Sequence, residues 1–95
     1  MTLLPIDGPA EHTTISVTTT EVEAKAGASA LEERKVVTIQ PLDGRVRVLF
    51  ESGVAASDGI LVFKYQIVTF EATHQQPIYL RTESGTTEVV VVERA

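Results

Sequence analysis

The sequence predicts an all-β domain, a small antiparallel β-sandwich or barrel of about seven strands with an extended N-terminal arm. Val, Ile and Thr, which favour strands, are abundant, whereas aromatic residues make up only 5% of the chain. Short stretches of alternating apolar and polar residues recur along the chain, and Gly, Pro, Asp and Ser separate them. A chain of 95 residues forms one domain by the usual size relation. We expect the arm at residues 1–12 and the β-domain at residues 13–95.

The N-terminal segment contains two prolines and a glycine, which disfavour a regular helix and keep the segment extended. It also carries three large apolar side chains. The segment is therefore either a frayed terminus or an arm that docks on a neighbouring subunit. In the second case, the residues that contact the partner are Leu3, Leu4, Pro5, Ile6 and Pro9.

Alternation of apolar and polar side chains predicts the strands in order. Ile15 and Val17 alternate with hydroxyl residues in the first strand. Residues 21–25 form either a separate second strand or a prolongation of the first. Pro41 ends the third strand, and Asp43-Gly44 predicts a hairpin to the fourth. The expected ranges are 13–20, 21–25, 35–40, 45–51, 60–64, 66–72, 78–83 and 86–94.

The connections are short and rich in small or polar residues. Residues 26–30 are expected to form a loop, because a helix that starts at Ser29 would be too short to be stable without packing.

In the fourth strand Val46, Val48 and Phe50 are expected to point inward. The inward residues of the next two strands would be Leu61 with Phe63 and Val68 with Phe70.

The last strand contains Val89-Val90-Val91-Val92, so apolar side chains lie on both of its faces. A strand in an exposed sheet would alternate instead. Either this is a central strand with the core on one side and a loop on the other, or its second face meets another chain. In the latter case Val90 and Val92 contact the partner.

Charge and composition exclude several classes of partner. The net charge is −5 and no basic cluster is longer than Arg34-Lys35, so no nucleic-acid partner is expected. No apolar run is long enough to span a membrane and the N-terminus lacks the features of a signal peptide, so we expect no membrane partner and synthesis in the cytoplasm. The absence of Cys excludes disulfides. Oligomerisation could then supply the stability that a thin core lacks.

No pattern of catalytic residues is present. His12 and His74 have no second ligand at a spacing typical of metal sites, and Asp58 lacks the oxygen ligands that a calcium loop needs. Neither a Gly-x-Ser-x-Gly motif nor a phosphate-binding Gly-rich loop occurs. We therefore expect no enzymatic activity, no metal and no cofactor. Most acidic side chains fall at outward strand positions and are expected in solvent: Glu21, Glu23, Glu71, Glu83, Glu88 and Glu93.

Three segments, RKVVTIQPLDGRVRVLF, SDGILVFKYQIVTFE and QPIYLRTESGTTEVVVVERA, resemble a class of short virion proteins of tailed bacteriophages. In that class a basic residue leads a Val/Ile-rich strand, and the chain ends with Ile-Tyr, then Ser-Gly-Thr and a Val-rich strand. The turn Pro41-Leu42-Asp43-Gly44 is a departure, because these proteins often have an Asn-rich turn there. The matching positions are 34–40, 46–50, 59–61, 78–80 and 84–92.

The resemblance implies a β-sandwich or barrel without enzymatic activity. Proteins of this class decorate or cement the capsid, lie at the head–tail junction or belong to the tail. Capsid decoration is our main expectation: copies of the chain, assembled as a homotrimer, would bind the major capsid protein on the surface of the virion. The alternative is a carbohydrate-binding sandwich, but such modules usually present exposed aromatic residues, and this chain has no Trp and only Tyr65 and Tyr79 as tyrosines.

Overall fold

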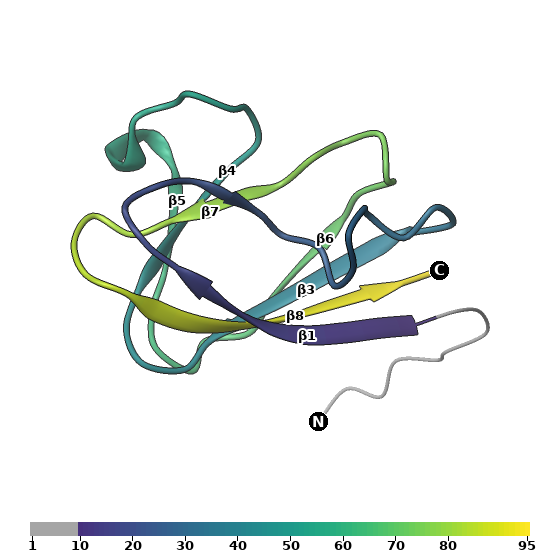
Figure 1. Cartoon of the computed structure of the whole chain (residues 1–95), viewed down its shortest axis with the longest axis horizontal. Coiled ribbons are helices and arrows are strands. Elements are labelled where there is room, and N and C mark those ends of the chain that lie inside the picture. Colours follow the sequence, from purple (N-terminus) through teal and green to yellow (C-terminus); the bar gives the residue numbers. More distant parts are fainter. Residues whose placement is uncertain (1–9) are drawn as a thin grey trace.

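The structure, a computed structural model, describes residues 10–95 and contains eight strands. The strands are β1 (Ala10–Val17), β2 (Val22–Glu23), β3 (Val36–Pro41), β4 (Val46–Leu49), β5 (Ile60–Val62), β6 (Val68–Glu71), β7 (Tyr79–Arg81) and β8 (Thr87–Arg94), and a short 3-10 helix, η1 (Ala56–Asp58), lies between β4 and β5. One sheet has the order β1-β8-β3-β6 and the other β2-β7-β4-β5, and the two form the layers of a sandwich (Figure 1). All neighbouring strands are antiparallel, so the prediction of a small antiparallel β-sandwich is confirmed. Within residues 10–95, no helix is long and apolar enough to cross a membrane.

The core lies between the two sheets and consists of alternate side chains of their strands. In β8 every second residue is buried, from Thr87 to Glu93, and β3 buries Val37 and Ile39 in the same way. A side-chain period of two is what a strand with one covered face requires. The buried apolar residues of the core are Val17, Ala24, Val37, Ile39, Val46, Val48, Val62, Ala72, Ile78, Leu80, Val89 and Val91.

The hairpin predicted at Asp43-Gly44 is wrong. β3 belongs to the first sheet and β4 to the second, so the residues between them carry the chain from one layer to the other. β3 already has β8 along one edge and β6 along the other, which leaves no edge for β4. An Asp-Gly pair favours a turn, but it does not decide which strands pair.

The bounds expected for the N-terminal arm and the inward residues expected for β5 also differ from the structure. β1 begins at Ala10, so residues 10–12 of the expected arm pair with β8 as part of the first sheet. The arm residues predicted to contact a partner belong to residues 1–9, outside the described part of the chain. In β5 the buried residue is Val62, while Leu61 is half-buried and Phe63 is 55% exposed. The inward set expected for this strand is therefore wrong by one position.

The outer face of the second sheet is covered by residues 50–59, the connection between β4 and β5. Leu49 points to this side of the sheet and is only 3% exposed. Two outward arginines hold the connection, because Arg47 Nη1 donates to Gly59 O at 3.1 Å and Arg81 Nη1 donates to Val54 O at 3.2 Å. On the first sheet, by contrast, outward side chains of both edge strands are exposed. The first sheet therefore presents the more open outer face.

Candidate functional site

The outer face of the β1-β8-β3-β6 sheet, here called the open face, has the outward side chains of β8 at its middle. Val90 and Val92 both point to this face and are half-buried, whereas Val89 and Val91 fill the core. The two rows of cross-strand neighbours at the middle are His12, Val92, Thr38 and Thr69 in one row and Thr14, Val90 and Gln40 in the other. Apart from His12 and Gln40, these rows consist of Val and Thr side chains.

Formal charges on the open face lie at its two ends. Arg94 and Glu71 share one end, and Glu88 lies at the other, where Ser16 Oγ donates to Glu88 Oε1 at 2.5 Å. In the described part of the chain, the two middle rows contain His12 as their only titratable side chain. The centres of protein–protein interfaces are depleted in charged residues. The middle of the open face therefore has a composition suited to contact with another protein.

An exposed apolar loop adjoins the open face next to the edge strand β6. Residues 63–67 link β5 to β6, and Gln40 Nε2 on the open face donates to Tyr65 O at 3.1 Å. Extending the β3–β6 register by one position sets Ile67 beside Gln40. Phe63, Tyr65 and Ile67, here called the tip cluster, are 55%, 62% and 64% exposed. Apolar surface thus continues beyond the sheet at this edge.

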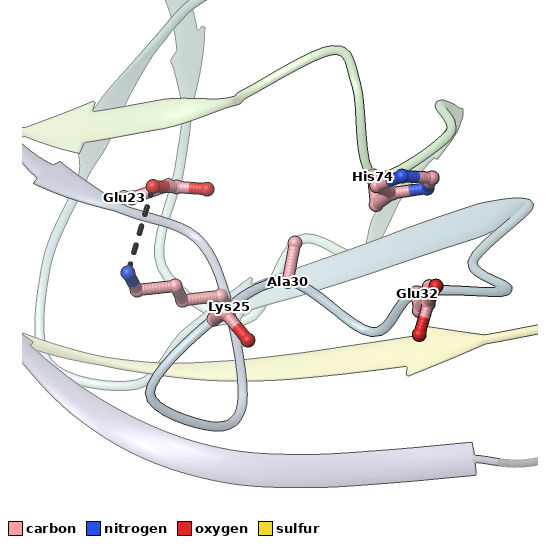
Figure 2. Close-up of a pocket in the computed structure, with 6 residues that line it drawn as sticks. Glu23, Lys25, Ala30, Glu32 and His74 are labelled. Atoms are coloured by element: carbon pink, nitrogen blue, oxygen red, sulfur yellow. Dashed lines mark ion pairs between the residues drawn. The ribbon is translucent and has the colours of Figure 1, made fainter.

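A polar hollow of about 430 Å³ lies between the residues that follow β2 and the loop that holds His74 (Figure 2). Lys25 Nζ lies 3.6 Å from Glu23 Oε1 on one side of the hollow, and Glu32 and His74 lie on the other. Across residues 10–95, no three His, Asp or Glu side chains gather closely enough to hold a metal ion. The hollow is lined by both hydrogen-bond donors and acceptors and by both acidic and basic side chains. Its composition therefore does not favour one class of ligand.

The structure places the predicted site residues in different regions. Val90 and Val92 lie together on the open face, and the two histidines are exposed, His12 on the open face and His74 at the hollow. Sequence reasoning missed the tip cluster, because Phe63 was expected to point inward. A signal was present in the stretch FKYQI, where three large apolar residues occur at alternate positions at the break between two strands.

Comparison of the chain with family models, with curated proteins and with solved structures finds no match.

Proposed function

We propose that this domain is a non-enzymatic structural protein of a tailed-phage virion, which assembles with copies of itself and binds the capsid shell. The observation that carries the proposal is the middle of the open face around Val90 and Val92, which contains no Asp, Glu, Lys or Arg. Burying these half-exposed side chains against a partner removes apolar surface from water without desolvating a formal charge. A surface of this composition suits a protein partner.

The size of the domain supports assembly. The Cα radius of gyration is 12.5 Å, and the single core is built largely from Val. Domains of this size bury a small share of their surface and are only marginally stable. Binding to a shell or to other copies adds stability by mass action.

The resemblance of the chain to short phage virion proteins supplies the class of partner. Capsid decoration or cementing by a homotrimer is the form that we propose, with the major capsid protein as the partner. A place at the head–tail junction or in the tail would use the same open face.

A second candidate function has one observation in its favour. Phe63 and Tyr65 are neighbouring exposed aromatic residues at 55% and 62%, and exposed aromatic rings are what a carbohydrate-binding module needs for stacking on sugars. Glycan-array binding by the purified domain, lost on replacing Tyr65 with Ala, would favour this function over the structural one.

The proposed function is tested by co-sedimentation of the purified chain with shells assembled from the major capsid protein that is encoded next to its gene. The informative variant is Val92→Glu, which puts a charge in the middle of the open face. Its matched control is Ala55→Glu, which adds the same charge to an exposed residue of the connection that covers the other sheet. We expect the wild type and Ala55→Glu to sediment with the shells and Val92→Glu to remain in the supernatant. Failure of the wild type to bind, or equal binding of both variants, would overturn the proposal.

A further inference from the structure

We infer that the tip cluster is the contact by which one copy of this chain binds another. This inference rests on the self-assembly part of the proposed function and names the surface responsible for it. That surface is the loop of residues 63–67, which adjoins the open face at Gln40 and lies at the opposite side of β3 from Val90 and Val92.

The exposed area of the tip cluster fits an interface between copies. With exposures of 55%, 62% and 64%, the residues Phe63, Tyr65 and Ile67 present roughly 350 Å² to solvent. A stable interface buries about 800 Å² on each partner, a little over half of it apolar. The tip cluster would therefore supply a large part of the apolar area that each copy needs.

The backbone of the tip loop is fixed without help from the Tyr65 side chain. Tyr65 N–H donates to Pro41 O at 2.8 Å, and Tyr65 O accepts from Gln40 Nε2 at 3.1 Å. Gln66 N–H donates to Phe63 O at 3.0 Å, and Gln66 Oε1 accepts from Phe63 N–H at 3.1 Å. The apolar side chains are thus held outward on a defined turn, which lowers the ordering cost of binding.

Tyr65 occupies a backbone conformation that favours glycine. Its φ is +64°, and among residues 10–95 it is the one non-glycine residue with a positive φ. A bulky residue in this region is strained, while Gly adopts it at no steric cost. The residue is 62% exposed and so adds little to the core. A strained residue with an outward side chain points to a use of that side chain outside the fold.

The charge distribution of the chain permits a second copy as the partner at the tip cluster. The chain carries a net charge of −5, so two copies repel each other over most of their surface. Residues 59–70 contain no Asp or Glu. The single charge there, Lys64, has its ammonium 5.0 Å from the centroid of the Tyr65 ring. Two copies that meet at the tip cluster therefore bring no carboxylates of this segment together.

The test is sedimentation equilibrium of the full chain over a range of concentrations. The informative variant combines Tyr65→Gly with Ile67→Thr, and the matched control is Ile60→Thr, which makes the same Ile-to-Thr change at another exposed isoleucine, 47% exposed. We expect the wild type and the control to have the mass of an oligomer. In the double variant the dissociation constant should rise at least about tenfold. At a concentration low enough for both proteins to be monomeric, its thermal midpoint should be unchanged or higher than that of the wild type, because Gly relieves the strain at position 65.

Three results would overturn the inference: a monomeric wild type, an unchanged dissociation constant in the double variant, or an equal loss of mass in the Ile60→Thr control. Shell binding is measured separately in the co-sedimentation test above. A monomeric chain that still binds shells through Val92 would refute this inference alone, whereas an oligomer lost in the double variant but unable to bind shells would refute the proposed capsid role alone.

Discussion

Arg34 and Glu93 form an ion pair that is wholly buried. Arg34 Nη1 donates to Glu93 Oε2 at 3.0 Å, and both side chains are 0% exposed. Their other partners are backbone groups of two connections, so the pair ties these connections to β8 and closes one end of the sandwich. Arg34 donates to Ala72 O, Thr73 O and Gln76 O, and Glu93 accepts from the N–H groups of Ala26 and Leu31.

Removing the cation of this pair should strongly destabilise the domain. Arg34→Met leaves the Glu93 carboxylate buried without its counter-ion, which costs about 3–5 kcal/mol. The control is Lys25→Met, because the Lys25–Glu23 pair is longer at 3.6 Å and partly exposed; its loss should cost about 1 kcal/mol or less. The free energy of unfolding from urea titrations followed by circular dichroism measures both. Equal losses in the two variants would contradict a special role for the buried pair.

The strand content of the fold could be predicted from the sequence because it depends on local alternation. The pattern of the last strand, for example, correctly gave apolar residues on both faces around Val89 to Val92. The pairing of strands could not be predicted in the same way. Asp43-Gly44 indicates a turn, but only the occupation of both edges of β3 by β6 and β8 shows that the chain must cross to the other sheet.

The buried ion pair could not be predicted from the sequence either, because it also depends on residues that are far apart in the chain. Glu93 was expected on a solvated face, and this expectation is wrong, since the residue is 0% exposed. Its position has the same parity as the core residues Val89 and Val91, which was the available signal. Its partner Arg34 is separated from it by 59 positions, so no local spacing could connect the two side chains.

Replacing Gly59 should destabilise the domain for a steric reason. A Cβ at this position would lie 2.8 Å from Val48 O and 3.1 Å from Leu49 Cδ2, although the φ of −88° suits any residue. Gly59→Ala must therefore push the covering connection away from the sheet, and we expect a loss of about 1–3 kcal/mol in unfolding free energy. In the control Gly27→Ala, the new Cβ meets nothing closer than 3.6 Å, and stability should stay within about 1 kcal/mol of the wild type. Similar losses in both variants would argue against the close approach at Gly59.

The Glu83–Arg47 pair should make a small, pH-dependent contribution to stability. Arg47 Nε donates to Glu83 Oε1 at 2.8 Å, and this hydrogen bond and the charge of Arg47 lower the pKa of Glu83 from its usual value of 4.5. A carboxyl whose pKa is lower in the folded state contributes its full stability above the unfolded pKa and loses it as the pH falls through the folded pKa.

Comparison of Glu83→Gln with the wild type tests this dependence. The wild type should have the higher denaturation midpoint at neutral pH, and the difference should vanish at a pH well below 4.5. Added salt should also reduce the difference at neutral pH, because exposed charges are screened. A difference that stays constant across this pH range would mean that the pair does not stabilise the fold through the ionised carboxyl.

The two faces of β8 should respond differently to the same substitution. Val91 is 0% exposed in the core, so Val91→Thr buries a hydroxyl where apolar side chains surround it, and we expect a loss of about 1–3 kcal/mol in unfolding free energy. Val92 lies next to it on the half-buried open face, between His12 and Thr38, where a hydroxyl can reach solvent or the neighbouring Thr38. Val92→Thr should therefore change the stability of the isolated domain by less than about 0.5 kcal/mol. Chemical denaturation at a low protein concentration separates the two cases, and a large loss for Val92→Thr would show that its outer side chain stabilises the single chain rather than a contact with a partner.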